Sequence, residues 1–315
     1  MIDKKKIIID TDNGDDIDDL FALYLALSRE DIEIIGITTT YVNTNLRARQ
    51  IKKVLKLAGK ENIPVYAGLG TPLKTLHPCD VNYKFCQYQK DLENDEFAPI
   101  NDSEGCNGVS AVDFLIGKSD ELASDLTIVC IGPLTNIATA ILKSPSSMRK
   151  PSIAMMGGCF SKIEREWNIA CDYEAAKIVF NSKLNLTAIG VDVTKKTEIS
   201  TELQDRILNY KTQDPYLAYL IEAANLWFNA TKRRIVLHDP LVLYSVYNQD
   251  IFEFNEYHVC VEDQGKLTMA LTVPLEELLW VQFANVNKDD YSLTKCAADV
   301  CSDIFIEDFV RQLGF

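Results

Sequence analysis

The chain has 315 residues, 47% of them hydrophobic, which is enough for one large α/β domain or two modest ones with a sizeable core. Its 46 acidic residues against 32 basic ones give a formal net charge of -14, so nucleic acid and anionic membranes would be repelled as partners. No stretch approaches a membrane span, and the short run before the first strand-like segment does not fit a signal peptide. The nine cysteines include no Cys-x-x-Cys pair, so we expect reduced thiols in a cytoplasmic protein.

Strand-like runs alternate with helical patterns along the first two thirds of the chain. Strands are predicted at 6–10, 32–40, 64–66, 126–131, 153–156 and 186–191, and helices at 17–28, 46–58, 134–142 and 172–180. After residue 193 the pattern is helical through residue 228, and strand-like runs at 252–261 and 267–273 precede a closing helix. We therefore predict a single α/β domain over residues 1–315, with a mainly parallel central sheet flanked by helices and a helical C-terminal portion.

The stretch from residue 69 to residue 107 interrupts this alternation. It is polar, carries aromatic residues and prolines, and is far longer than a usual connection between elements. Within the single domain it is predicted to be an active-site flap or a partly disordered loop.

An acidic cluster follows the first strand directly. The segment Asp10-Thr11-Asp12-Asn13-Gly14-Asp15-Asp16-Ile17-Asp18-Asp19 holds six carboxylates within ten residues. Ligands of open α/β sheets bind at the carboxyl ends of strands, and carboxylates packed this closely require a cation or a helix N-terminus to compensate their charge. Oxygen ligands without a nearby histidine or cysteine favour calcium or magnesium over zinc. Some of the six, Asp15 and Asp16 especially, are expected only to cap the helix that follows.

Two other classes of acidic motif were weighed for this segment. An EF-hand loop fails, because Gly14 is fifth from Asp10 where that loop needs a glycine at its sixth position. A magnesium-dependent phosphohydrolase with Asp10 as nucleophile stays an alternative, although no lysine or hydroxyl groups can be assigned to hold a phosphate. A non-catalytic binding protein on the same scaffold is the third possibility.

Further motifs follow in order between about Lys6 and Leu243. They are Ile34 to Asn43, Val129 to Ala138, Met156-Gly157-Gly158 with Glu166 to Ala176, and Leu237-His238-Asp239-Pro240. Together with the acidic cluster they resemble, in order and with sensible gaps, the inosine-uridine-preferring nucleoside hydrolase family. The resemblance implies hydrolysis of the N-glycosidic bond of a small-molecule ribonucleoside to free base and ribose, in salvage, by a homo-oligomer (dimer or tetramer).

The resemblance also implies the residues of the site. Calcium would have four protein ligands, namely Asp12, Asp19, Asp239 and the backbone carbonyl of Ile131. Asp12 would be the general base that activates the calcium-bound water, and His238 would help to protonate the departing base. The ribose hydroxyls would be bound by Asp18, Asn43, Glu166, Asn168 and Asp239.

Taken singly, several of these residues have ordinary structural alternatives. Asn43 is at a strand end, where turn residues are common, and Trp167 is expected to pack rather than to stack on a base. His238 and Asp239 could simply precede a helix that starts at Pro240. Only the order of the motifs favours the site.

The sequence departs from the family pattern at three places, which concern the metal site and the contacts to the substrate. Two extra residues separate Gly14 from Asp18, which leaves open whether Asp15 or Asp16 joins the metal site. The family's asparagine for the ribose 5′ hydroxyl has no match, with residues 159–161 in that space.

The third departure is that residues 101–105 stand where many members carry a base-contacting histidine. His77, Tyr83, Phe85 and Tyr88 in the flap are candidates to contact the base instead. The base of the substrate therefore stays open: it can be a purine, a pyrimidine or a modified base, as in deazapurine nucleosides such as queuosine. The altered contacts favour a nonstandard base.

Overall fold

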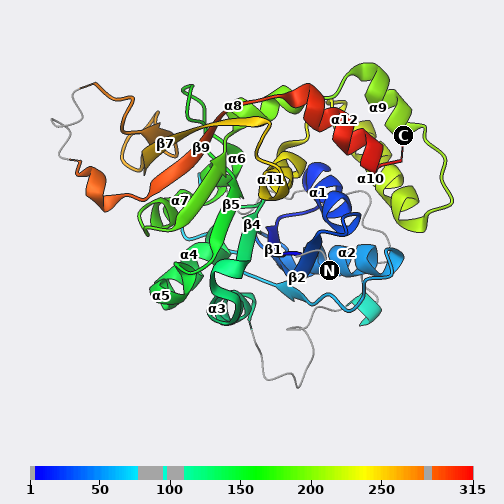
Figure 1. The fold of residues 1–315 in the computed structure, drawn as a ribbon, viewed down its shortest axis with the longest axis horizontal. Helices are drawn as coiled ribbons and strands as arrows, with labels where there is room; N and C mark the ends of the chain where they lie inside the picture. Colours follow the sequence, from blue (N-terminus) through cyan, green and yellow to red (C-terminus); the bar gives the residue numbers. More distant parts are fainter. Residues whose placement is uncertain (1–3, 77–94, 98–109, 280–285, 315) are drawn as a thin grey trace.

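The computed structural model describes residues 4–76, 95–97, 110–279 and 286–314, and these contain a nine-stranded sheet (Figure 1). The strand order is β3-β2-β1-β4-β5-β6-β9-β7-β8. The strands are β1 (Lys5–Thr11), β2 (Ile32–Thr39), β3 (Val65–Ala67), β4 (Leu126–Cys130), β5 (Ser152–Met156), β6 (Asn185–Ile189), β7 (Phe252–Val261), β8 (Thr272–Pro274) and β9 (Leu293–Val300). Strands β1 to β6 pair in parallel, as does β9 with β6, whereas β7 is antiparallel to both of its neighbours.

Helices cover both faces of this sheet. One face carries α1 (Asp18–Leu27), α2 (Thr44–Leu57), α10 (Pro215–Thr231), α11 (His238–Tyr247) and α12 (Ser302–Gln312). The other carries α3 (Ala111–Leu122), α4 (Thr135–Lys143), α5 (Pro145–Met148), α6 (Trp167–Cys171) and α7 (Tyr173–Phe180). The remaining α-helices, α8 (Val191–Thr194) and α9 (Thr201–Leu208), follow β6. The predicted α/β domain with a mainly parallel sheet and a helical C-terminal portion is confirmed.

The first strand explains why both faces need a cover. Ile7, Ile8 and Ile9 are consecutive and buried, and side chains of a strand alternate between the faces of the sheet. Ile7 and Ile9 therefore pack among one set of helices, whereas Ile8 packs among the other. A continuous apolar run of this kind is typical of a parallel strand buried on both sides.

Three elements of the fold, β8, β9 and α3, differ from the prediction. Residues 267–271 were expected in a strand, but they form a turn in which Thr268 and Met269 donate to the carbonyl of Gly265, and β8 begins only at Thr272. Strand β9 and helix α3 were not predicted. The sequence of β9 carries Lys295 and Asp299 among its apolar residues, so it lacks a clear apolar period.

The predicted flap lies largely outside the described residues, and His77, Tyr83, Phe85, Tyr88 and residues 101–105 all fall there. Its beginning is held against the domain, because Leu73 and Lys74 donate their backbone N–H groups to the Asp172 carboxylate at 2.8 and 3.1 Å. The six cysteines within the described ranges are all free thiols. In the same ranges no helix is both long and apolar enough to cross a bilayer.

Candidate active site

A cavity of about 490 Å³ opens beside the carboxyl ends of β1, β4 and β5. Asp12, Ile131 and Met156 follow or end these strands and contribute to its wall. The complete lining is Asp12, Gly14, Asp15, Asp16, Asp18, Asp19, Ile131, Met156, Glu164, Arg165, Glu166, Trp167, Asn168, Val191, Leu226, Trp227, Ala230, Thr231, Arg233, His238 and Asp239. Of the nine residues predicted for the site, only Asn43 is absent from this wall.

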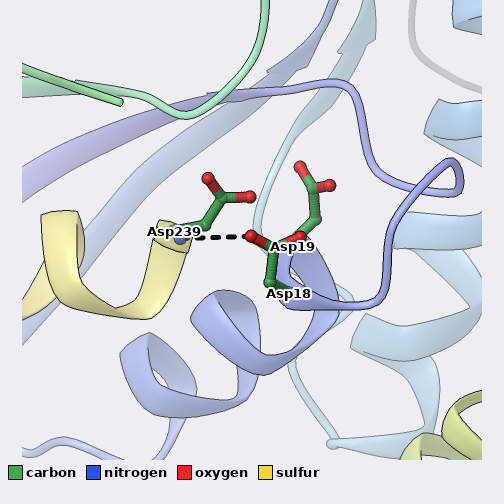
Figure 2. Close-up of side chains that lie close together, drawn as sticks. All are labelled: Asp18, Asp19 and Asp239. Carbon is green, nitrogen blue, oxygen red and sulfur yellow. Dashed lines mark hydrogen bonds between the residues drawn. The ribbon is translucent and has the colours of Figure 1, made fainter. Parts of the chain in front are cut away.

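Three carboxylates converge in the cavity where two helices begin (Figure 2). Asp18 and Asp19 are the first residues of α1, and Asp239 is the second residue of α11. Each is 4% exposed, and one oxygen of each lies within 4.8 Å of the others. The backbone N–H of Asp239 donates to Asp18 at 3.3 Å, which fixes the two helix starts beside each other.

The electrostatics of the three carboxylates fit a divalent cation with a preference for oxygen. Burial raises the pKa of Asp18, Asp19 and Asp239 well above the ordinary value, and neighbouring aspartates raise it further. Within the described residues, none of the three carboxylates forms an ion pair with a lysine or an arginine. Buried negative charges of this kind are stabilised by a hard cation such as Ca²⁺ or Mg²⁺, for which carboxylates are the usual ligands.

Asp12 lies in the same cavity and is 6% exposed, outside the group of three. Burial raises the pKa of its carboxyl to about 7, although the positive charge of Arg47 opposes the rise. A carboxyl with a pKa near neutrality is suited to accept a proton from water at physiological pH.

Arg47 supports the acidic loop from behind. Its guanidinium is fully buried and donates to the backbone carbonyl of Asp12, to that of Asn13 at 2.9 Å and to that of Tyr41 at 2.8 Å. It also forms an ion pair with Asp15 at 2.8 Å. The sequence interpretation missed this residue, because nothing in the local pattern of α2 marks an arginine as buried.

The two extra residues of the acidic loop have separate partners on opposite sides. Asp15 pairs with Arg47, whereas Asp16 pairs with Arg233 at 2.9 Å, in the connection between α10 and α11. The side chain of Asp16 is also 2.7 Å from the backbone N–H of Ile17, just before α1. The expectation that Asp15 and Asp16 only cap this helix is wrong, because α1 begins after Ile17 without a side-chain cap and both aspartates line the cavity.

Asn43 occupies the N-cap of α2, where its side chain accepts from the backbone N–H of Leu46 at 3.0 Å. Its side chain is exposed and is not part of the cavity wall. Tyr41 and Val42, just before it, have φ angles of 67° and 58°, which is uncommon for residues with a side chain and rare for a β-branched one. The turn after β2 is thus held in a strained conformation next to Arg47.

Glu166 and Asn168 enter the cavity from the start of α6. The Glu166 carboxylate accepts from the backbone N–H groups of Asn168 at 2.8 Å, Ile169 at 2.9 Å and Gly158 at 3.3 Å. Burial raises its pKa to about 7, and these hydrogen bonds act in the opposite direction. The Asn168 amide donates to the carbonyl of Ile131 at 3.3 Å, so the fourth expected calcium ligand is oriented by a neighbouring site residue.

Trp167 lines the cavity and is 43% exposed, which does not support the expectation that it packs rather than stacks on a base. The cavity wall also includes Leu226 and Trp227 of α10, which sequence reasoning did not single out. Residues 159–161, considered for the ribose 5′ end, are not in the wall, whereas Glu164 and Arg165 are.

His238 opens α11 and borders the cavity. Burial lowers the pKa of its imidazole to about 4, and the positive charges of Lys195 and Arg233 contribute to the decrease. The imidazole is therefore neutral near pH 7. Its Nδ1 atom is 2.6 Å from the hydroxyl of Thr194.

Asp10, by contrast, is fully buried and does not line the cavity. It accepts from the Thr38 hydroxyl and from the Asn136 amide, and burial raises its pKa to about 7. A residue in this position links the end of β1 to β2 and to α4, and it is not exposed to a substrate in the cavity.

The parallel sheet and the buried carboxylates in one cavity are the features of a metal-dependent α/β hydrolase. The model of the inosine-uridine preferring nucleoside hydrolase family matches residues 7–311. A probable uridine nucleosidase 2 of Arabidopsis thaliana is 30% identical over 301 residues, which cover 90% of this chain and 89% of that protein. This chain belongs to the nucleoside hydrolase family.

Solved structures agree with this assignment. A plant nucleoside hydrolase superposes with a TM-score of 0.80 at 25% identity, and a purine-preferring ribonucleoside hydrolase from Gardnerella vaginalis with a TM-score of 0.74 at 27% identity. In both comparisons 98% of each chain is covered. The predicted family and the hydrolase class are thereby confirmed.

Proposed function

We propose that this protein is a calcium-dependent ribonucleoside hydrolase, which uses water to cut the bond between the base and C1′ of the ribose. The observation that carries the proposal is the convergence of Asp18, Asp19 and Asp239 in one cavity with Asp12 and His238. Such a set combines a cation site, a general base and a group facing the leaving base, which are the three requirements of N-glycoside hydrolysis without a covalent intermediate.

The calcium ligands in this proposal are Asp12, Asp19, Asp239 and the carbonyl of Ile131. The acidic group supports Asp19 and Asp239, and the hydrogen bond from Asn168 leaves a second lone pair of the Ile131 carbonyl available. When bound, the ion would orient the attacking water together with the ribose diol and lower the pKa of that water. Asp15 and Asp16 are excluded from the proposed ligand set because each has an arginine partner.

Asp12 accepts a proton from the attacking water in this mechanism. As the bond to the base breaks, positive charge develops on C1′ and the ring oxygen of the ribose. The carboxylates around the cavity stabilise that charge more strongly than water would, because they are already fixed in a buried environment. Asp12 thus has two effects, one on the water and one on the sugar.

The ribose hydroxyls are proposed to contact Asp18, Glu166, Asn168 and Asp239, all of which line the cavity. Three backbone donors fix the Glu166 carboxylate, so it can accept from a ribose hydroxyl without losing side-chain freedom. The ribose contact of Asn43 stays a prediction, and its position as an exposed helix cap gives it no support.

The base is proposed to lie against Trp167, which lines the cavity and is 43% exposed, because an exposed indole ring offers a flat surface to any heterocycle. The names of relatives include both a uridine nucleosidase and a purine-preferring hydrolase. We therefore propose ribonucleosides as the substrate class. Modified nucleosides, including deazapurine nucleosides such as queuosine, are among the substrates to be tested.

The alternative phosphohydrolase receives no support from the position of Asp10, because that carboxyl is fully buried outside the cavity wall.

The test is ribose release from a panel of purine, pyrimidine and modified ribonucleosides, with and without a calcium chelator. We expect chelator-sensitive release that calcium restores, and a loss of about 10²-fold or more in kcat for Asp12→Asn. Asp299→Asn, which removes an exposed carboxylate paired with Lys196, is the matched control and should retain full turnover. Chelator-resistant turnover, or an active Asp12→Asn variant, would contradict the proposal.

A further inference from the structure

A hydroxyl group lies directly behind the histidine of the cavity. Thr194 is the last residue of α8, His238 is the first of α11, and their Oγ1 and Nδ1 atoms are 2.6 Å apart. The two segments are tied by a short antiparallel contact, in which Ile199 donates to the carbonyl of Ile235 at 3.1 Å. Thr197 donates its own hydroxyl to the Thr194 carbonyl at 2.8 Å. The threonine and the imidazole are thus held in register by the backbone.

The position of the hydroxyl proton follows from the burial of Thr194. The residue has no exposed surface, and in the described part of the chain the imidazole nitrogen is the hydrogen-bond partner of its hydroxyl. If Nδ1 carried the imidazole proton and donated it to Oγ1, the hydroxyl proton would be buried without an acceptor. An unpaired buried donor costs about 1–3 kcal/mol, so the opposite direction is favoured. The hydroxyl then donates, and Nδ1 accepts.

We propose that Thr194 is a positioning residue, which donates its hydroxyl to Nδ1 of His238 and thereby keeps the imidazole proton on Nε2, the nitrogen left for the departing base. The inference rests on the proposed function, because it assigns a role in the departure of a base from ribose. Thr194 is not in the cavity wall and acts only through His238.

The partner group determines what the histidine can do. A carboxylate behind an imidazole stabilises the positive imidazolium and favours full proton transfer, whereas a hydroxyl is neutral and mainly selects the tautomer. A neutral imidazole with the proton on Nε2 donates a hydrogen bond to the atom on which negative charge develops. This is the role that we assign to His238.

The bond from C1′ to the base breaks with its electron pair on the base, the water oxygen bonds to C1′, and Asp12 accepts one proton of that water. His238 stabilises the departing base by hydrogen bonding and keeps its proton. The base acquires its final proton from solvent, and Asp12 returns one to solvent.

The test compares leaving groups in Thr194→Val, a variant of nearly the same shape without the hydroxyl. Nucleosides need assistance to the leaving base, whereas p-nitrophenyl β-D-riboside releases a stable phenolate that needs none. We expect kcat on uridine or inosine to fall by about tenfold or more, with kcat on the nitrophenyl riboside changed by less than about twofold. Thr194→Ser keeps the hydroxyl and should restore nucleoside turnover.

Thr197→Val is the matched control, because it removes a neighbouring buried hydroxyl that does not contact the imidazole. It should not discriminate between the two kinds of substrate. Equal losses on both substrates in Thr194→Val would overturn the proposal, since they would indicate a structural effect, and so would unchanged activity on both.

The tautomer is read independently by ¹⁵N NMR of histidine-labelled protein, with the His238 signals identified in a His238→Gln variant. A protonated Nε2 and an unprotonated Nδ1 are expected, and a protonated Nδ1 would overturn the proposal whether or not the protein is active. Failure of the wild-type protein to release ribose from any nucleoside would instead refute the proposed function. The two failures are therefore distinguishable.

Discussion

Replacing Arg47 by methionine is expected to destabilise the protein far more than the loss of an ordinary arginine. Methionine keeps most of the apolar stem but removes the guanidinium, which pairs with Asp15 and donates to the carbonyls of Asp12, Asn13 and Tyr41. The Asp15 side chain is only 15% exposed, so its charge would stay largely buried without a partner.

The expected magnitude follows from that burial. Removing one partner of a buried ion pair costs about 3–5 kcal/mol, because the remaining charge has lost its compensation. Each carbonyl that loses a donor adds to the loss, although access of water to Asp15 reduces the total. We expect about 4 kcal/mol in the free energy of unfolding, which for a chain of this length corresponds to a decrease of about 6 °C in Tm.

The measurement is urea and thermal unfolding of Arg47→Met beside Arg234→Met, with chelator present throughout. Arg234 forms an exposed pair with Glu198, and its loss should cost less than about 1 kcal/mol. The double variant Arg47→Met with Asp15→Asn removes both charges and should recover part of the stability, in a double-mutant cycle with non-zero coupling. If Arg47→Met were no less stable than Arg234→Met, or if the coupling were zero, the reasoning would be refuted.

The remaining predictions concern the cation site and the acidic loop. Saturating calcium should raise the free energy of unfolding by about 2.7 kcal/mol at a concentration 100 times Kd, and thermal unfolding with a chelator should reverse the effect. Burial raises the pKa of Asp12 and Glu166 to about 7, so without a cation they contribute stability below about pH 4 that is lost as the pH rises through about 7. Metal-free protein should therefore melt at a higher temperature at about pH 5 than at about pH 8, and a higher Tm at the higher pH would contradict this sign. Because binding requires ionised carboxylates, calorimetry in buffers of different ionisation enthalpy should detect proton release on calcium binding. Arg233→Met should change the free energy of unfolding by less than about 1 kcal/mol, since the pair with Asp16 is 62% and 39% exposed, and a loss as large as that of Arg47→Met would contradict this.

The arrangement of the sheet was largely predictable because its strands carry a simple signal. Runs such as Ile7 to Ile9 are apolar throughout, and each parallel strand is followed by a helix of different period. Strand β9 has no such run, and it enters the sheet between β6 and β7 only because tertiary pairing selects it. The turn at Gly265 likewise depends on hydrogen bonds that no local pattern encodes.

Residues of the candidate site were predictable where they belong to a motif of recognisable spacing in the sequence. Asp18 and Asp19 begin α1, and His238 and Asp239 begin α11, so their position at helix starts was evident in the sequence. Arg47 and Thr194 were not predictable in the same way. Their partners lie 32 and 44 residues away, and neither residue type is distinctive on a helix.

The partners of the acidic loop explain how the chain accommodates two additional carboxylates beside a cation site. Arg47 compensates Asp15 from the buried side, and Arg233 compensates Asp16 from the exposed side. Neither arginine forms an ion pair with Asp18 or Asp19 in the described ranges, so the carboxyl groups of these two and of Asp239 are left to bind a divalent cation. The extra residues therefore change how the loop is anchored to α2 and to the α10–α11 connection, while the negative charge at the start of α1 stays available. This division predicts that Asp15→Asn alters stability and Asp19→Asn alters calcium affinity, which unfolding and calorimetry measure separately.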